Sequence, residues 1–183
     1  MDLYRYVQFL KKNDFHICSG RLNKMEKIIC FHNPEEINGY LSNWYLSDFT
    51  VDNISYSSME QYMMYQKALL FHDIEIAEQI LETSNVGKIK ALGRSVKNYD
   101  DIIWNGMRQL VVCKGLTEKF NQNVTLQKKL IETGNNILAE CAVQDKIWGI
   151  GLSMKDEKRF YMEKWRGKNL LGFSLMWVRQ LLS

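Results

Sequence analysis

Ser57-Ser58-Met59-Glu60-Gln61-Tyr62-Met63-Met64-Tyr65-Gln66-Lys67-Ala68 is the segment at the centre of the predicted fold. Two serines precede a run in which apolar residues recur near the helical period, so residues 57–68 are predicted to form a helix. Ser57 and Glu60 have the spacing of a capping box, in which the two side chains bond each other's backbone amides. We therefore expect a helix that begins at these serines and packs centrally.

Two ionisable side chains, Glu60 and Lys67, lie on nearly the same side of this predicted helix. They are separated by about two helical turns, and Met63 and Met64 lie between them. A carboxylate and an amine on a largely apolar face suggest the wall of a pocket. Two plainer interpretations stay open: Glu60 as a cap of its own helix, and Lys67 as a side chain that reaches the solvent.

The chain has 183 residues, which is long enough to bury a sizeable core, and we expect residues 1–183 to form one domain. Hydrophobic residues make up 46% of the chain and charged residues 25%, as in an ordinary soluble globular protein. The net charge of +3 permits a phosphorylated ligand but does not indicate a nucleic-acid surface.

The cysteine pattern and the apolar runs indicate a cytoplasmic protein. Cys18, Cys30, Cys113 and Cys141 are widely spaced, without a CxxC pair, and this favours a reducing compartment. No apolar run has transmembrane length, and the N-terminus lacks the hydrophobic region of a signal peptide. We therefore expect no contact with a membrane.

Periodicity predicts a mainly α, multihelical and irregular single domain with small β hairpins. Besides residues 57–68, helices are expected over 2–12, after a cap at Asp73, after a cap at Ser84, over 98–120, over 123–133 with Gly134 as the C-terminal cap, and over 172–182. Residues 93–95 are expected to interrupt the helical pattern. Residues 143–168 mix glycine, tryptophan and charge and are expected to be irregular.

Three segments carry strand signals. Residues 25–31 form a candidate strand that Asn33-Pro34 ends. Asp52-Asn53 separates two short apolar runs and predicts a hairpin that leads into the central helix. Residues 136–142 are short and are compatible with a strand.

The common catalytic and metal-binding motifs are absent. His16, His32 and His72 are scattered, and neither HExxH nor a zinc-type cysteine and histidine spacing occurs. There is no GxSxG, no Walker loop and no complete GxGxxG. We therefore expect neither a metal ion nor a cofactor.

The candidate functional residues outside the central helix are distributed, and each has a plainer interpretation. Trp148 is compatible with a buried core aromatic as well as with a stacking platform. Asp145 is compatible with the cap of a loop, and Arg94 with a surface ion pair. Asn169 is compatible with a cap of the last helix. Gly149, in the sequence Gly-Ile-Gly, is compatible with a simple turn.

Taken together in chain order, these residues resemble the NADAR/YbiA-like family of N-glycosidases. The resemblance covers about residues 39–182, so residues 1–38 are expected to be an N-terminal extension packed on the domain. The shared pattern consists of Leu41-Ser42-Asn43-Trp44-Tyr45, Ser58-x-Glu60-x-Tyr62-x-x-x-Gln66-Lys67-Ala68, Gly93-Arg94, Trp104, Met107, Thr133-Gly134, Leu138-x-Glu140, Asp145-x-x-Trp148-Gly149-Ile150-Gly151 and Trp165-x-Gly167-x-Asn169-Leu170-Leu171-Gly172-x-x-Leu175-Met176-x-x-Arg179.

The resemblance implies an enzyme that cleaves the bond between a ribose C1 and a nitrogen base. Some members act on phosphorylated ribosylaminopyrimidine intermediates of riboflavin synthesis, and others remove ADP-ribose from guanine in nucleic acid. The substrate is therefore expected to be a ribosylated base, either a small molecule or attached to nucleic acid. Functional pairing with riboflavin enzymes or with an ADP-ribosyltransferase would follow.

The resemblance also assigns roles to residues of this sequence. The catalytic residues it implies are Glu60, Lys67 and Asp145. The substrate-binding residues it implies are Ser42, Asn43, Trp44, Arg94, Trp104, Glu140, Trp148, Gly149 and Asn169. A carboxylate can stabilise the oxocarbenium ion or orient water, and a desolvated lysine can instead form a Schiff base with a ring-opened ribose. Arg94 with Lys168 can hold a phosphate.

This sequence departs from the family pattern at two positions. Gln61 stands where many members have histidine, and Ile150 stands where some have aspartate. A non-catalytic module that binds ADP-ribose or a related nucleotide remains the alternative to an enzyme. The presence of both Glu60 and Lys67 favours the enzyme, because a pure binding module would not need that pair.

Overall fold

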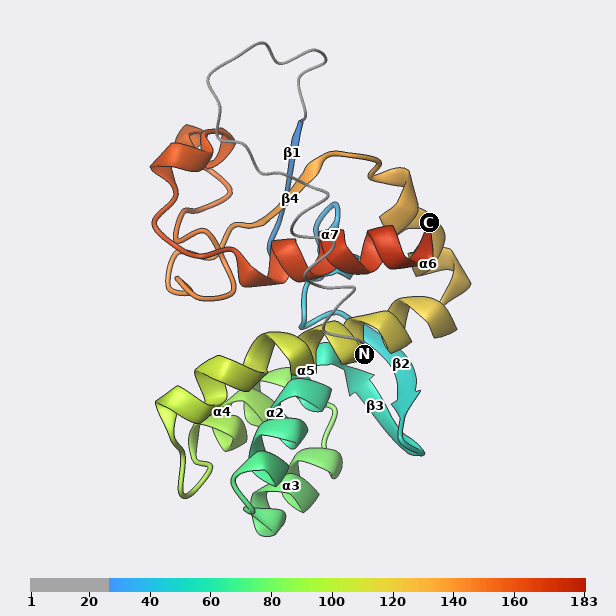
Figure 1. Ribbon diagram of the computed structural model, residues 1–183, viewed down its shortest axis with the longest axis vertical. Coiled ribbons are helices and arrows are strands. Elements are labelled where there is room, and N and C mark those ends of the chain that lie inside the picture. The colour runs from blue at the N-terminus through green and yellow to red at the C-terminus, as the bar shows by residue number, and fades with distance from the viewer. Residues whose placement is uncertain (1–26) are drawn as a thin grey trace.

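The computed structural model describes residues 27–183 as a mainly α single domain, which confirms the predicted fold class (Figure 1). The helices are α2 (Met59–Leu70), α3 (Ile74–Leu81), α4 (Val86–Arg94), α5 (Asp101–Gln122), α6 (Val124–Glu132) and α7 (Leu170–Leu182). The strands are β1 (Ile28–Phe31), β2 (Leu46–Val51), β3 (Ile54–Ser58) and β4 (Ile137–Glu140). The helix expected over residues 2–12 and the start of the strand expected over 25–31 lie outside the described residues.

Helix α2 packs against α3, α4 and α5, as expected for the central helix. Its cap differs from the prediction by one residue. Ser58 accepts a hydrogen bond from the Gln61 amide at 3.2 Å, and the Gln61 side chain accepts one from the Ser57 amide at 2.7 Å. The predicted capping box of Ser57 and Glu60 is therefore wrong. Gln61 takes the role expected of Glu60, so the Glu60 carboxylate is not used as a cap.

The predicted hairpin is present, and it delivers the chain directly into α2. Strands β2 and β3 pair antiparallel, with Val51 opposite Ile54. Asp52 and Asn53 have φ angles of 50° and 64°, the left-handed conformation that a tight two-residue hairpin turn requires. Asparagine and aspartate adopt this conformation at a lower cost than most other residues.

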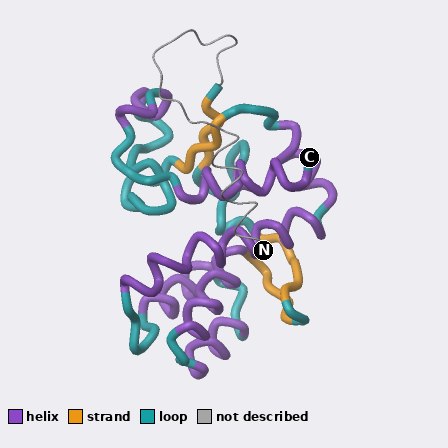
Figure 2. The backbone as a smooth tube through the Cα atoms, viewed as in Figure 1, coloured by secondary structure: helices purple, strands orange, loops and turns teal. Residues whose placement is uncertain are grey.

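The second pair of strands is parallel and not a hairpin. Strand β1 pairs with β4, so that Phe31 lies opposite Glu140, and α7 packs on β4 (Figure 1). Strand β1 lies within the N-terminal extension expected over 1–38, yet it forms part of the domain core through Phe31. Between β4 and α7 the chain is irregular, with short 3-10 turns at Glu157–Phe160 and Met162–Lys164 (Figure 2).

Helix α4 is longer than predicted. Asn85, and not Ser84, caps it by accepting a hydrogen bond from the Lys88 amide at 2.9 Å. The helix continues through Gly93 and Arg94, so the interruption expected there is wrong. Gly93 packs directly on the Met64 side chain of α2, and a Cβ atom at that position would collide with it. The glycine thus marks a close helix contact.

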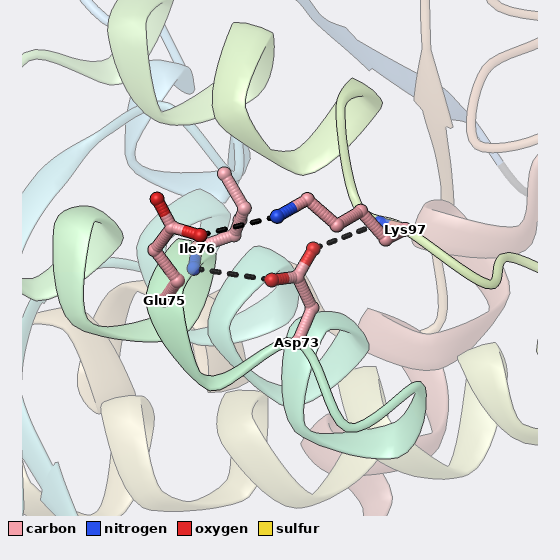
Figure 3. Close-up of polar contacts among 4 residues, drawn as sticks. All are labelled: Asp73, Glu75, Ile76 and Lys97. Atoms are coloured by element: carbon pink, nitrogen blue, oxygen red, sulfur yellow. Dashed lines mark hydrogen bonds and ion pairs between the residues drawn. The ribbon is translucent and has the colours of Figure 1, made fainter.

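Asp73 joins the start of α3 to the chain that leads into α5 (Figure 3). Its carboxylate accepts hydrogen bonds from the amide of Ile76 at 3.4 Å, as the predicted cap, and from the amide of Lys97 at 2.8 Å. The Lys97 side chain returns to Glu75, at 3.1 Å. These contacts fix the position of the residues that precede α5.

Helix α5 is the longest described helix, as predicted. The side of the helix that carries Ile103 and Met107 remains partly exposed, with exposed fractions of 49% and 40% for these two residues. The buried side instead includes Trp104, Arg108 and Lys119. Within residues 27–183, no helix combines the length and apolar composition that a membrane crossing requires.

Candidate functional site

A cavity of about 460 Å³ lies between α2, α4, α5, β4 and the loops that follow η1 (Gly39–Leu41) and β4. Its volume is within the usual range for small-molecule sites. Eight of the predicted site residues line it, although they come from separate parts of the chain. These residues are Asn43, Trp44, Glu60, Arg94, Trp104, Glu140, Asp145 and Trp148.

Glu60 lies in the first turn of α2 and is 4% exposed. Its backbone amide donates to the carbonyl of Asn43 at 2.9 Å, and this bond joins the loop carrying Trp44 to the helix. Burial raises the pKa of the Glu60 carboxyl to about 7; Lys90 and Arg94 oppose the rise, and Asp145 adds to it. Glu60 can therefore hold or release a proton near neutral pH.

Glu140 ends β4 and faces the same cavity. Burial raises the pKa of its carboxyl to about 8, and the negative charges of Asp145 and Glu60 add to the rise. Its Oε2 atom is excluded from solvent and has no hydrogen-bond partner in the described chain. A buried carboxyl group without a partner is costly unless a ligand bonds it.

Asp145 has two tasks. Its Oδ1 atom accepts hydrogen bonds from the amides of Ile147 and Trp148 at 2.9 and 2.8 Å, so the loop-cap interpretation is correct. The residue also lines the cavity, together with Trp148. The cap fixes both the carboxylate and the tryptophan in the cavity wall.

A cation and three indole rings complete the wall. The Lys90 ammonium group lies 5.3 Å from the centre of the Trp44 ring. The Trp44 side chain lowers the pKa of the Glu60 carboxyl against the larger effect of burial. Trp104 and Trp148 offer flat apolar faces suited to a purine or pyrimidine ring.

Lys67 is not among the cavity-lining residues. Its ammonium group donates to the carbonyl of Gly93 at 2.7 Å and lies 4.2 Å from the centre of the Tyr99 ring. Burial lowers the pKa of the Lys67 amine, and the charge of Asp101 opposes this. Lys67 follows Glu60 by seven residues, so its side chain lies on the same side of α2 but about 10 Å further along the helix axis. The amine therefore supports the wall behind Tyr99.

Ser42, Gly149 and Asn169 lie behind the wall rather than in it. The Ser42 hydroxyl accepts a hydrogen bond from the Trp44 amide at 3.2 Å. A Cβ atom on Gly149 would lie 2.8 Å from the Glu140 carbonyl, so glycine permits the close approach of the loop to β4.

Asn169 is fully buried and binds the end of β4. Its side chain donates to the Leu138 carbonyl at 2.8 Å and accepts from the Glu140 amide at 3.1 Å. It makes no side-chain bond to the start of α7, so the expected cap role is wrong. The asparagine instead determines where β4 presents Glu140.

Met63 and Met64, expected on the pocket wall between Glu60 and Lys67, do line the cavity. Sequence reasoning missed six other lining residues: Lys90, Tyr99, Asp101, Asn105, Arg108 and Ile147. Arg108 carried a usable signal, because it follows the predicted pocket residue Trp104 by one helical turn. Lys90 precedes the predicted site residue Arg94 by one helical turn, but the interruption expected at residues 93–95 concealed this signal. Lys168, expected beside Arg94, does line the cavity. No group of three or more His, Cys, Asp or Glu side chains within residues 27–183 is placed to hold a metal ion.

The chain is similar to several characterised proteins. It is 40% identical over 163 residues to N-glycosidase R617 of Acanthamoeba polyphaga mimivirus, covering 85% of this chain and 96% of that protein. It is 32% identical over 162 residues to riboflavin biosynthesis protein VVA0006 of Vibrio vulnificus, covering 88% of this chain but only 40% of that longer protein. It is 28% identical to N-glycosidase YbiA of Escherichia coli over 158 residues, covering 86% of this chain and 90% of that protein.

The fold agrees with these similarities. The solved structure of Escherichia coli YbiA matches with a TM-score of 0.72 at 28% identity, covering 87% of this chain and 86% of that one. The NADAR domain model matches residues 30–183 and thus includes the second half of β1. The names of the relatives confirm the predicted enzyme class, hydrolases that act on N-glycosyl bonds. The chain therefore belongs to the NADAR domain family.

Proposed function

We propose that this protein hydrolyses the C1–N bond between a ribose that carries a phosphoryl group and a nitrogen base. The observation that carries the proposal is that two glutamates from separate elements, Glu60 and Glu140, face one cavity, where burial raises the pKa values of their carboxyl groups to about 7 and about 8. N-glycosidic hydrolysis needs a proton for the leaving base and a negative charge beside the oxocarbenium ion. Two carboxyl groups with different proton affinities can supply both.

The proposed reaction assigns one step to each carboxyl group. Glu140 has the higher pKa and is largely protonated at pH 7, so it donates its proton to the base nitrogen as the C1–N bond breaks. The bonding electrons leave with the base. Glu60 accepts a proton from the water whose oxygen attacks C1. Asp145 adds negative charge beside the developing cation.

The remaining lining residues support a ribosylated base as substrate. Trp104 and Trp148 can stack on the base, and Trp44 lines the same cavity. Arg94 and Lys168 are exposed cations at the cavity and can attract the phosphoryl group. The substrate-binding role proposed for Ser42, Gly149 and Asn169 is indirect, through Trp44 and Glu140.

Two substrate classes fit this proposal. The relative named as a riboflavin biosynthesis protein favours phosphorylated ribosylaminopyrimidines, and a cytoplasmic enzyme would then work beside riboflavin enzymes. ADP-ribosylated guanine contains the same ribose C1–N bond and phosphoryl group, and would require an ADP-ribosyltransferase as the source of substrate. The described cysteines Cys30, Cys113 and Cys141 are free thiols, in keeping with a reducing compartment.

A covalent route through Lys67 is the second mechanistic candidate. Its lowered pKa favours nucleophilic attack, but the amine bonds the Gly93 carbonyl and does not line the cavity. Direct attack by water therefore accounts better for the geometry. The two routes differ in whether borohydride traps a substrate adduct.

Chromatography of reaction products tests the proposal. The protein is incubated separately with a phosphorylated ribosylaminopyrimidine, with ADP-ribosylated guanosine and with an unphosphorylated N-riboside. We expect free base and a sugar phosphate from at least one phosphorylated substrate. Tight binding of these substrates without release of base would instead identify a non-catalytic binding module.

A further inference from the structure

Arg108 is a buried cation that the proposed reaction does not yet use. It is 7% exposed, lies on the buried side of α5 one turn after Trp104, and lines the cavity. All ion pairs described for residues 27–183 involve other cations, namely Lys97 and Lys114. Within that part of the chain the guanidinium group also has no hydrogen-bond partner. A cation that lines a cavity and has no partner in the described chain is suited to bind an anionic ligand.

The position of Arg108 differs from that of the cations near the carboxyl groups. Lys90 and Arg94 act on the carboxyl group of Glu60, whereas Arg108 acts on the hydroxyl group of Tyr99. Tyr99 also lines the cavity. Asp101 of α5 lines the cavity as well and accepts a hydrogen bond from the Tyr99 hydroxyl at 2.7 Å. Arg108 therefore lies on the α5 side of the cavity, apart from the Glu60 and Glu140 carboxyl groups where the glycosidic bond would be cleaved.

We propose that Arg108 determines substrate specificity by binding the phosphoryl group on O5′ of the ribose whose C1 faces Glu60 and Glu140. The inference rests on the proposed function. Guanidinium forms two parallel hydrogen bonds to a phosphoryl group, a geometry that lysine cannot reproduce. Both candidate substrate classes carry a phosphoryl group on this oxygen, so the same residue serves either of them.

Burial makes Arg108 a stronger anchor than the other lining cations. Arg94 and Lys168 are exposed, so water and salt weaken their attraction for an anion. Only 7% of the Arg108 surface is exposed, so water and salt screen its charge less. A phosphoryl group that enters therefore gains hydrogen bonds to a charged donor.

Binding of small ligands to the complete chain tests the proposal without requiring hydrolysis. Dissociation constants are measured by calorimetry for ribose 5-phosphate, ADP-ribose and ribose. We expect Arg108→Met to weaken ribose 5-phosphate binding roughly 10- to 100-fold and to leave ribose binding unchanged. Arg108→Lys is expected to lie between the two proteins. Lys114→Met removes a charge from the same helix outside this cavity and should bind all three ligands like the wild type.

The two ligand sources give separate outcomes. If Arg108→Met loses equal affinity for ribose 5-phosphate and ADP-ribose, the shared O5′ phosphoryl group is the group that Arg108 binds. If it loses affinity for ribose 5-phosphate alone, the proposal is restricted to phosphate monoesters. A loss for ADP-ribose alone, or unchanged binding in Arg108→Met, overturns it. Normal phosphate-dependent binding by a protein that releases no base would contradict the proposed function and leave this inference intact.

Thermal unfolding of the ligand-free variants separates anchoring from a structural role. Methionine keeps the apolar stem and removes an unpaired buried charge, so the Tm of Arg108→Met should equal or exceed that of the wild type. A markedly lower Tm together with weaker binding of ribose would show that the arginine supports the fold, and would overturn the proposal.

Discussion

The two buried cations of α5 have contrasting surroundings. Lys119 is fully buried, donates a hydrogen bond to the Tyr40 carbonyl at 3.0 Å and lies 5.4 Å from the centres of the Tyr45 and Phe120 rings. Arg108, about three turns earlier, is nearly as buried but has only the cavity before it. The same helix thus carries Lys119, whose charge is bonded within the protein, and Arg108, whose charge is available to a ligand.

The contrast extends beyond α5. Two buried amide side chains of the frame are bonded within the protein: Gln61 bonds the carbonyls of Ile80 and Thr83, and Asn169 bonds β4. At the cavity, the Oδ1 atom of Asn43 and the Oε2 atom of Glu140 are buried without partners. Native proteins rarely leave such groups unbonded. Buried atoms of His32, Ser47, Tyr56 and Arg159 also lack partners in the described chain but lie outside the cavity. Asn43 and Glu140 differ from them because a substrate in the cavity can reach their side chains.

Glu60→Gln should have the largest effect on catalysis. Glutamine keeps the size and polarity of the side chain but cannot exchange a proton, so kcat should fall roughly 10²- to 10⁴-fold. Because Gln61 provides the helix cap, Tm should not fall. Product chromatography and thermal unfolding measure the two quantities. Glu78→Gln, an exposed position on α3, is the matched control and should behave as wild type.

Asn169→Ala should have the largest effect on stability. It leaves the Leu138 carbonyl and the Glu140 amide unpaired and places alanine at a φ angle of 52°. The free energy of unfolding should fall by about 2–4 kcal/mol. Asn98→Ala, at an exposed residue with a φ angle of 55°, carries only the backbone cost. If urea unfolding shows the same decrease in the free energy of unfolding for Asn169→Ala and Asn98→Ala, the role assigned to Asn169 is contradicted.

Lys67→Arg should retain part of the activity, losing about tenfold or less. Arginine keeps a positive charge and donors for the Gly93 carbonyl and the Tyr99 ring, which supports the wall but excludes a Schiff base. Borohydride added with substrate should give no adduct on the wild type. A trapped adduct on Lys67, together with complete inactivity of Lys67→Arg, would instead make the lysine the nucleophile.

Lys119→Met should reduce the increase of stability with pH above pH 7. Burial lowers the pKa of the Lys119 amine to about 7, so between pH 7 and 10 the unfolded chain binds the extra proton. The contribution of Lys119 to stability therefore improves as pH rises through this range. Urea midpoints at pH 6 and 9 should show the variant gaining most, relative to wild type, at pH 6. Lys114→Met should show no such difference.

The sequence predicts the elements whose signals are local. The period of residues 57–68 gives α2, Asp52-Asn53 gives the hairpin turn, and Gly134, with a φ angle of 57°, ends α6. The partners of these elements are not local. The pairing of β1 with β4 joins residues more than 100 positions apart, and nothing in either strand specifies a parallel arrangement.

The site residues could be predicted where they share a sequence pattern. They could not be predicted where the extent of the cavity or the burial of a side chain determines the role. Glu60 and Lys67 share a side of α2, but only the packed structure shows that the cavity ends before Lys67. Arg108 lies on the buried side of α5, which hydrophobic periodicity alone does not separate from the partly exposed side around Met107. Which buried charges lack partners depends on side chains from other elements.

The central claim is that the cavity holds two carboxyl groups that exchange protons near neutral pH. Carbon-13 NMR of protein labelled at the glutamate carboxyl carbon follows them directly in the wild type, Glu60→Gln and Glu140→Gln. The account predicts transitions near pH 7 and 8, well above the ordinary value of 4.5, with one lost in each variant. If every glutamate titrates below about pH 5.5, within the range usual for this residue, the claim is contradicted.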